Sequence, residues 1–362
     1  PITAPGYTYV PADKRAATPT PIPGSATTAP SPDPAIRAPA PPAAPLVPLT
    51  YADLIRRPEL WPAQCTVKAM MQFQGGTTVK AGQTVKVDGL TAQEVELSTL
   101  DNKIQFAAAP DETDVLAVAN TEYAALSPAQ RELTYATIAR RKELWPYRLT
   151  IGQTLDLGRG QTVNPGDTAI LVKFDRGNPF VIAEKFRTSF TISPQATDLM
   201  TQARRFVEAG DAAPSRVGTE LDGKLISSVT GQPTSIDAAS PPRYYVFYRG
   251  SSTCSITRGF TPSLVKFYNE QHPKHPVFEI IYIMTEAPAD TGRFAREAGF
   301  AWLAVDYETT GRMPVMGEPF GSLLPQLVVM DRAGNVLANG VQGTVPAALQ
   351  TLDALLNQPA VR

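Results

Sequence analysis

The segment SSTCSITRGFTP, residues 251–262, holds the residue types with the clearest chemical potential in the chain. It follows RYYVFYR, an apolar and aromatic run that favours a buried strand, and it precedes a helix expected over residues 261–270. Cys254 therefore lies near a helix N-terminus, where unpaired backbone N–H groups and the helix dipole favour a thiolate. Thr257 follows three residues later, so its hydroxyl can point back at the sulfur. The spacing predicts an activated thiol, with an inert small residue as the alternative.

The remaining cysteine and the histidines give no pattern of metal ligands. Cys65 and Cys254 are the two cysteines of the chain, which is too few for a disulfide scaffold or a zinc site. His272 and His275 both lie in QHPKHP, a proline-broken segment without carboxylate or cysteine partners at ligand spacing, and are expected in a solvated loop. We therefore predict no metal and no cofactor.

The bulk composition is that of an ordinary globular protein. Of 362 residues, 43% are hydrophobic and 19% are charged, and the net charge is −1. This balance gives no electrostatic reason to bind nucleic acid or an anionic membrane. No apolar run approaches the roughly 18 residues needed to cross a bilayer. The partners that we expect are proteins, with no nucleic acid and no direct membrane span.

Residues 1–48 form a proline-rich arm. They contain 14 of the 35 prolines, interleaved with Ala, Thr and Ser. Such a segment has too few apolar side chains to build a core and favours an extended, polyproline-like conformation. It is either a flexible spacer or an arm that docks on a neighbouring chain or on its own domains, because a stiff extended segment loses little entropy on binding.

An internal repeat covers the middle of the chain. LTYADLIRRPELWP at residues 49–62 recurs as LTYATIARRKELWP at residues 133–146, with ten of fourteen positions identical and an offset of 84. The same offset relates Pro110, Thr113 and Asp114 to three identical residues, which are Pro194, Thr197 and Asp198. We therefore predict two copies of one module, at residues 49–128 and 133–212.

Each module is expected to be a small β-rich binding or spacing unit. Several short strand-like runs separated by Gly-containing turns suggest a small barrel similar to the Src-homology-three type. An amphipathic helix is expected to follow in each copy, capped by Thr113 or Asp114 in the first and by Thr197 or Asp198 in the second. Trp61 and Trp145 are expected to pack in these modules. Cys65 corresponds to Leu149, which favours a core position over a disulfide with Cys254.

The pattern changes after a linker with hairpin character at residues 213–242. Residues 243–249 and 277–284 read as buried strands, and residues 261–270 and 290–299 read as helices. LVVMD and NVLANG then form a hairpin before a final helix at residues 345–357. The resulting order, βαβαββα, predicts a three-layer α/β domain over residues 243–362, with parallel strands and one antiparallel edge. The fold class is thus multidomain, with two β-barrel-like modules before an α/β domain.

The segment YYVFYRGSSTCSITRGFTPSLVKFYNEQHPKHPVFEIIYI resembles the thioredoxin superfamily, and within it the tryparedoxin and nucleoredoxin branch. That branch carries Trp-Cys-Pro-Pro-Cys ahead of Arg, Gly or Lys and then Phe-Thr-Pro, and RGFTP at residues 258–262 matches as it stands. WLAVDY and LLPQLVVMDRAGNVL resemble downstream segments of the family and align Pro325 with its cis-proline. The resemblance covers residues 220–357 and implies a thioredoxin-like fold.

The departures from the family motif concern the chemistry. Cys254 matches the attacking cysteine, whereas Thr253 stands for the tryptophan and Thr257 for the second, resolving cysteine. A dithiol enzyme uses the second thiol to release its mixed disulfide. The resemblance thus implies a Cys-x-x-Thr site of monothiol type, in which Cys254 attacks, Thr257 stabilises the thiolate and Pro325 aligns the substrate backbone.

Two functions from different classes fit these residues. The first is an extracytoplasmic thiol–disulfide oxidoreductase or isomerase of monothiol type, which acts on thiol substrates through Cys254. The second is a redox-inactive assembly subunit that uses the thioredoxin-like fold, the repeats and the arm for protein–protein contacts. The extracytoplasmic location is expected from the composition of the arm and from the family resemblance alone.

Overall fold

The computed structural model describes residues 46–73, 77–237, 241–306, 309, 313–314 and 319–358. The chain divides into two units, Pro1–Leu46 and Val47–Arg362, and the described residues belong almost wholly to the second. The predicted proline-rich arm lies outside the described residues except for its last three positions.

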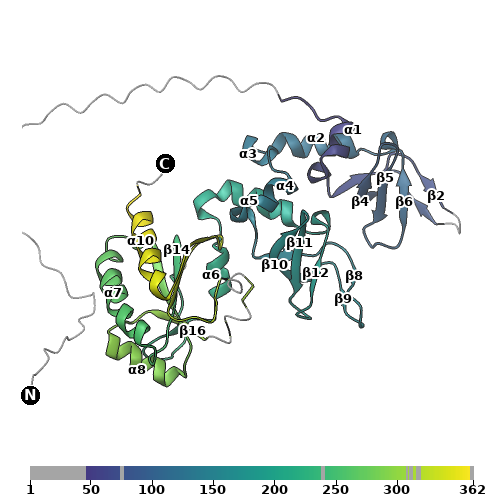
Figure 1. Ribbon diagram of the computed structural model, residues 1–362. Helices are drawn as coiled ribbons and strands as arrows, with labels where there is room; N and C mark the ends of the chain where they lie inside the picture. The colour runs from purple at the N-terminus through teal and green to yellow at the C-terminus, as the bar shows by residue number, and fades with distance from the viewer. Residues whose placement is uncertain are drawn as a thin grey trace, which may run out of the picture. The chain divides into compact units, whose positions relative to one another are not determined.

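Along the chain, the first module begins and ends with a helix and has short strands between them (Figure 1). Its elements are α1 (Tyr51–Arg56), β1 (Gln64–Thr66), β2 (Met71–Gln72), β3 (Thr78–Val79), β4 (Thr84–Leu90), β5 (Val95–Thr99), β6 (Gln105–Ala108) and α2 (Val115–Ala125), and α3 (Pro128–Arg131) leads to the next module. The core of the first module includes Leu54, Cys65, Val85 and Leu97, all buried.

The second module repeats these elements 84 residues later along the chain. Its elements are α4 (Tyr135–Arg140), β7 (Arg148–Thr150), β8 (Leu155–Asp156), β9 (Thr162–Val163), β10 (Thr168–Asp175), β11 (Asn178–Ala183), β12 (Ser189–Thr191) and α5 (Leu199–Ala209). Strand pairing also keeps the offset, since Cys65 pairs with Val85 and Leu149 pairs with Ala169. The indole N–H groups of Trp61 and Trp145 donate to backbone oxygens seven residues upstream, each at 2.7 Å.

The expected small barrel is not formed by the described strands. Each module has an open four-stranded antiparallel sheet, in the orders β1-β4-β5-β6 and β12-β11-β10-β7, and a separate two-stranded hairpin. In the first module, the outer strands β1 and β6 have three and four residues. They do not pair with each other, so the sheet stays open. The prediction of barrel closure was therefore wrong, because closure depends on long-range pairing that short strand patterns do not specify.

Of the residues expected to cap α2 and α5, the threonines bind the first turn, since Thr113 Oγ1 accepts the N–H of Val115 (3.4 Å) and Thr197 Oγ1 accepts that of Leu199 (3.3 Å). Asp114 and Asp198 precede α2 and α5, but neither side chain caps its helix. Each carboxylate instead accepts a backbone N–H from the first strand of its module, at Thr66 (2.6 Å) and Thr150 (2.8 Å). These aspartates tie the last helix of each module to its first strand.

The C-terminal domain is built on a six-stranded mixed sheet in the order β13-β16-β15-β14-β17-β18 (Figure 1). Its elements are α6 (Arg216–Leu221), β13 (Ile226–Ser227), β14 (Tyr244–Arg249), α7 (Ser255–Gln271), β15 (Phe278–Met284), α8 (Pro288–Ala298), β16 (Leu303–Asp306), β17 (Gln326–Asp331), β18 (Val336–Val341) and α10 (Val345–Leu356). Strands β14, β15 and β16 are parallel, and β17 is antiparallel to β14.

Alternate side chains of the central strands enter two different cores. Tyr244, Val246 and Tyr248 of β14 pack with the helices α7, α8 and α10. Tyr245 and Phe247 of the same strand pack on the opposite face, against α6. This alternation with a period of two, buried on both faces, is what an apolar run such as YYVFYR requires.

Three features of this domain differ from the sequence-based expectation. Helix α7 begins at Ser255, directly after Cys254, rather than near Thr261. Strand β16 was not predicted, because its four residues show little periodicity. The predicted linker at residues 213–242 contains α6 and β13, and β13 pairs with β16, so part of it belongs to the C-terminal sheet. The described order is thus βαβαβββα from β14 onward.

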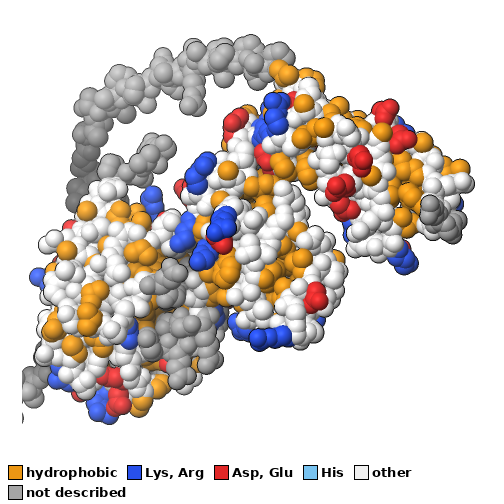
Figure 2. Space-filling model, turned by 45° about the vertical axis from the view of Figure 1, so that its right-hand side comes forward, with side chains coloured by type: hydrophobic (Ala, Val, Ile, Leu, Met, Phe, Trp, Pro, Cys, Tyr) orange, Lys and Arg blue, Asp and Glu red, His pale blue; other side chains and the backbone are white. Residues whose placement is uncertain are grey.

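No helix among the described residues combines the length and apolarity needed to cross a bilayer. On the face seen in Figure 2, blue and red side chains occur in small groups among orange and white atoms, as the net charge of −1 would suggest.

Candidate functional site

Cys254 occupies the junction between a buried strand and a long helix. Strand β14 ends at Arg249, and Cys254 is the N-cap residue of α7. Its N–H donates to the Ser251 carbonyl at 3.2 Å, and its carbonyl accepts the N–H of Arg258 at 3.0 Å. The side chain is half-buried, so the sulfur is held by a defined backbone and is still accessible.

The surroundings of Cys254 stabilise its charged form. The pKa of the Cys254 thiol is lowered, first by hydrogen bonds from the hydroxyl and the backbone N–H of Thr257 and then by the N–H of Ile256. Partial burial acts in the opposite direction and is outweighed. All three donors belong to the first turn of α7, the Thr257 hydroxyl and two backbone N–H groups that the helix leaves free, so the lowered pKa follows from the position of the cysteine at the helix start.

Thr257 is fixed beneath the loop that carries the cysteine. Its side chain is fully buried, and its hydroxyl oxygen accepts the N–H of Ser251 at 3.4 Å. That bond leaves the hydroxyl hydrogen available to the sulfur. The loop approaches closely at Gly250, where an added Cβ would lie 2.6 Å from Thr257 Cγ2. Any side chain at this glycine would therefore displace Thr257.

Pro325 directly precedes β17 and follows Leu324, the residue whose carbonyl faces the sulfur. The Leu324–Pro325 peptide bond is cis, and Pro325 is buried. The Leu324 carbonyl oxygen is 4.0 Å from Cys254 Sγ, and the Pro325 carbonyl accepts the N–H of Gln342 at 2.8 Å. The fold thus brings together all three residues singled out in the sequence, Cys254, Thr257 and Pro325.

Glu286 is a further residue of this site that sequence reasoning missed. It follows β15, and its Oε1 atom accepts the N–H (2.8 Å) and the hydroxyl (2.9 Å) of Ser252 and the hydroxyl of Ser251 (2.5 Å). The Ser251 hydroxyl also lies 2.8 Å from the Thr253 hydroxyl. Glu286 therefore clamps the loop just before the cysteine.

The hydrogen bonds of this clamp also favour the charged form of Glu286. Partial burial alone would raise the pKa of its carboxyl, but hydrogen bonds from Ser251 and Ser252 outweigh it, and the pKa is lowered. Glu286 is thus a carboxylate at neutral pH. The run of hydroxyl residues ahead of Cys254 is visible in the sequence and could have suggested a hydrogen-bonded loop. Its partner, Glu286, could not be read from the sequence in this way, because it lies 34 residues beyond Ser252.

Cys65 has the opposite environment. It is 2% exposed, lies in the core of the first module and forms no disulfide. Burial, together with the charge of Asp114, raises the pKa of the Cys65 thiol to about 12. The core position expected from its counterpart Leu149 is confirmed.

The histidines form no metal site with the acids and cysteines of the described residues, among which no cluster of three or more such ligands occurs. His272 ends α7 and lies 3.6 Å from a Glu279 oxygen. Its ring stacks on Tyr268, with the centroids 4.6 Å apart.

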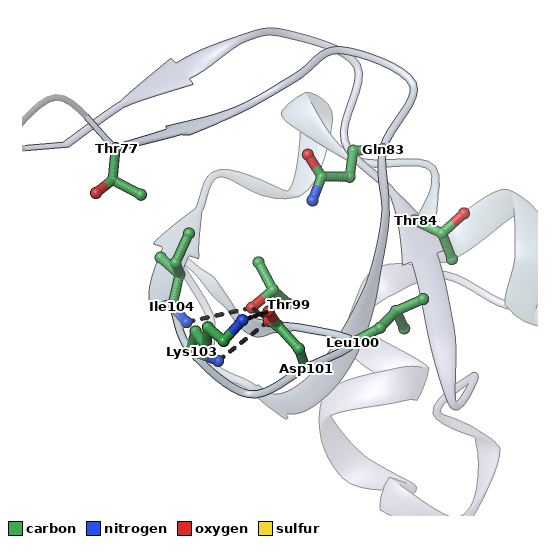
Figure 3. A pocket seen from close by; sticks show the side chains of 8 residues that line it. All are labelled: Thr77, Gln83, Thr84, Thr99, Leu100, Asp101, Lys103 and Ile104. Carbon is green, nitrogen blue, oxygen red and sulfur yellow. Dashed lines mark hydrogen bonds and ion pairs between the residues drawn. The ribbon is translucent and has the colours of Figure 1, made fainter.

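A separate open groove of about 660 Å³ lies in the first module (Figure 3). Figure 3 shows Thr99, Asp101 and Lys103 joined to one another along one wall. The lining residues are Thr77, Gln83, Thr84, Thr99, Leu100, Asp101, Lys103 and Ile104. They include no cysteine or histidine, so this groove offers no thiol chemistry.

No model of a known protein family matches the chain. Among solved structures, the chain is similar to tryparedoxin I from Leishmania major, with 24% identity over 40% of this chain and 97% of that one and a TM-score of 0.30. It is similar to tryparedoxin II from C. fasciculata, with 21% identity, coverage of 41% and 95%, and a TM-score of 0.32.

A third similar structure is the thioredoxin domain of a thiol-disulfide oxidoreductase from Bacteroides vulgatus. It shares 20% identity over 37% of this chain and 95% of that one, with a TM-score of 0.30. The three similar structures are thus two tryparedoxins and a thioredoxin domain, the kind of protein that the sequence resemblance predicted, and each similarity covers less than half of this chain.

Proposed function

We propose that this protein carries out thiol–disulfide exchange of monothiol type through Cys254. The observation that carries the proposal is the lowered pKa of a half-buried thiol at the start of α7, beside the Leu324 carbonyl. An accessible thiolate is the reactive form of cysteine, and a defined backbone beside the sulfur can orient an extended substrate. Thr257 stabilises the thiolate, and Pro325 shapes the segment next to it.

The reaction begins with attack of the Cys254 thiolate on one sulfur of a target disulfide. A new sulfur–sulfur bond forms, the target bond breaks, and the released target sulfur takes a proton from solvent. Thr257 occupies the position from which a second thiol would attack. An external thiol, or another cysteine of the target, must therefore attack the mixed disulfide and release Cys254 as a thiolate. The first route leaves the external thiol in a disulfide with the target, and a second equivalent of that thiol must attack this disulfide, which leaves the target reduced and the external thiol oxidised to its own disulfide. The second route forms a new disulfide within the target and so isomerises it.

A redox-inactive assembly subunit is the second candidate. It is favoured by the cysteine content, since the other cysteine, Cys65, is buried in a different module and cannot resolve a mixed disulfide at Cys254. In that case the thioredoxin-like domain would provide a binding surface for protein partners.

Trapping of the mixed disulfide distinguishes these functions. The full chain is mixed with an oxidised glutathione or peptide disulfide, quenched with acid, and analysed by mass spectrometry. We expect an adduct on Cys254 that excess reduced thiol removes, and none in a Cys254→Ser variant. An unmodified Cys254 at concentrations that modify a free peptide thiol would reject the exchange function and favour the assembly subunit.

We also propose the wider setting of this chemistry. The organisation would be an arm at residues 1–48, modules at residues 49–128 and 133–212, and a catalytic domain at residues 243–362 to which the segment at residues 213–242 contributes α6 and β13. The location would be extracytoplasmic, in the periplasm or cell envelope, and the substrates would be protein thiols. Reductant-sensitive capture of partners by the free Cys254 thiol would support this, whereas partners captured equally well with reductant would support assembly.

A further inference from the structure

The tryptophans of the two modules occupy the same place in the repeated framework. The indole N–H groups of Trp61 and Trp145 donate to backbone carbonyls seven residues upstream. In each module the N–H of one strand residue, Val87 or Leu171, donates to the carbonyl two residues beyond the tryptophan, at 3.2 and 3.0 Å. The strand register shifts directly after that residue in both modules. The two frameworks therefore match around the tryptophan.

In the second module, an arginine from the segment that follows the module fills this place. Arg216 of α6 is 3% exposed, and its guanidinium lies 5.2 Å from the Trp145 ring centroid. Its Nη2 atom donates to the carbonyls of Leu171 and Val172, at the bulge where the register shifts. A planar guanidinium stacks on an indole and donates several hydrogen bonds at once, which a lysine ammonium does not match. The second module thus shows how this face holds an arginine.

The same face of the first module is more open and carries acids. Trp61 is half-buried, whereas Trp145 beneath Arg216 is 8% exposed. The bulge residue is Asp88, which is exposed, and Glu96 of the neighbouring strand is exposed as well. The Glu96 carboxylate lies over the backbone next to the bulge, where a Cβ added at residue 89 would collide with it. Both carboxylates are therefore placed beside the bulge.

The acids are particular to the first module. The residues at the positions of 88, 89 and 96 in the second module are uncharged or basic: Val172, Lys173 and Phe180. The repeated framework forms there without acids, so a structural role common to both modules does not explain Asp88 and Glu96. Carboxylates beside an aromatic ring attract a cation. The first module thus has the charge to hold an arginine that comes from outside it.

We propose that this face of the first module, formed by Trp61, Asp88 and Glu96, binds an arginine side chain of a partner protein. The guanidinium stacks on the indole and donates to the bulge carbonyls, as Arg216 does on Trp145. The two carboxylates accept its remaining N–H groups, in charge-assisted hydrogen bonds that the second module does not offer. The site is independent of the thiol chemistry proposed above, because it lies in a different module.

The test is an NMR titration of the isotope-labelled full chain with a blocked Gly-Gly-Arg-Gly-Gly peptide, observed at the tryptophan indole N–H signals. We expect the Trp61 signal to shift with a Kd of about a millimolar. The signals of Trp145, which Arg216 covers, and of Trp302, in the core of the C-terminal domain, should stay in place. The citrulline peptide keeps the shape without the charge and should bind at least about fivefold more weakly, and the lysine peptide at least about threefold.

Asp88→Asn should weaken binding of the arginine peptide by about three- to tenfold, because it removes one of the two carboxylates. The matched control is Asp111→Asn. Asp111 is an exposed acid of the same module beyond the other end of β1, where its carbonyl accepts Lys68 Nζ at 3.1 Å. It should change the affinity less than about twofold. The proposal is overturned if the Trp61 signal does not shift at about 10 mM peptide, roughly ten times the expected Kd. It is also overturned if both acid variants act alike or if arginine and citrulline bind equally.

The proline-rich arm is the other source of arginine to be tested, since residues 1–48 include Arg15 and Arg37. A full chain with Arg15→Gln and Arg37→Gln separates the two sources. An affinity for the peptide that stays within about threefold supports an arginine from a partner. An affinity that rises by more than about threefold means that the arm competes for the face, and it overturns the assignment to a partner.

Discussion

The two cysteines of this chain show how position alone sets the chemistry of one side chain. Cys65 lies in a short strand whose neighbours bury it, and the pKa of its thiol is raised to about 12. Cys254 lies where a strand gives way to a helix, and the pKa of its thiol is lowered by the donors of the helix start. Burial favours the neutral thiol, whereas free N–H groups favour the thiolate.

The two modules give a second comparison, because they share one framework of helices and strands but differ in their surface residues. In the first module, Thr77 and Ile104 line the open groove. In the second module, the residues at these positions, Gln161 and Thr188, are joined by a 2.7 Å hydrogen bond across the same space. The second module thus joins two positions that in the first module line an open groove, while the framework stays the same.

The largest expected effect is the difference in reactivity between the cysteines. At pH 7 we expect iodoacetamide to modify Cys254 at least about a hundredfold faster than Cys65, because the thiolate is the nucleophile and Cys65 is neither ionised nor accessible. The rate at Cys254 should rise with pH and level off below pH 9, the usual value for a thiol. Mass spectrometry of digests measures both rates, and similar rates would contradict the comparison.

Cys65→Ser and Cys254→Ser should have opposite consequences. Cys254→Ser should leave the free energy of unfolding within about 0.5 kcal/mol, as is usual for an accessible site. Cys65→Ser places a hydroxyl in an apolar core and should cost about 1–3 kcal/mol, with adduct formation at Cys254 unchanged. Chemical denaturation measures the stability of each variant. Loss of adduct formation in Cys65→Ser with intact folding would mean that the two thiols cooperate.

The pH dependence of stability sharpens this contrast. The raised pKa keeps Cys65 neutral in the folded protein up to about pH 12, whereas an unfolded thiol ionises near pH 9. Ionisation then favours the unfolded state, so stability should fall between pH 9 and 12, by no more than about 1.4 kcal/mol per pH unit. Cys65→Ala should remove this part of the slope. An unchanged slope would show that the thiol ionises equally in both states.

The sequence could predict the cysteine site better than its surroundings. The strand, the cysteine and the helix start are contiguous, so local patterns place Cys254 and Thr257. Glu286 could not be found in this way, because it reaches Ser252 only through the pairing of β14 with β15. The expected barrel failed for the same reason, since its closure depends on which distant strands pair. The offset of 84 residues, by contrast, recurs in the described elements because each module carries its own core.

Thr257→Val should have a moderate effect on the thiol. The variant keeps the shape of the side chain but removes the hydroxyl hydrogen bond, which stabilises the charged form, so the pKa of Cys254 should rise. We expect a rise of about one unit, because hydrogen bonds to charged groups contribute about 1.5–3 kcal/mol and this one is partly solvated. Alkylation rates as a function of pH measure the shift. Thr257→Ser should restore the lower pKa, and a failure to do so would assign the effect to packing.

Glu286→Gln should have the smallest effect, and it tests whether the clamp positions the cysteine. The lowered carboxyl pKa means that the folded state favours the carboxylate, so its stabilising contribution is present at neutral pH and is lost as the pH falls below about 4.5. Glutamine keeps the shape and one acceptor but loses the charge that strengthens the bonds from Ser251 and Ser252. We expect adduct formation at Cys254 to slow by about three- to tenfold, since weaker bonds leave the loop less well oriented.

A matched variant decides whether this loss comes from the clamp. Glu270→Gln removes an exposed carboxylate near the C-terminal end of α7, where its oxygen lies 3.9 Å from Lys266 Nζ. It should leave the rate unchanged within about twofold. If Glu286→Gln also leaves the rate unchanged, while the pKa of Cys254 stays low, the helix start alone suffices to present the thiolate. If both variants slow adduct formation equally, general surface charge rather than the clamp governs the approach of the disulfide.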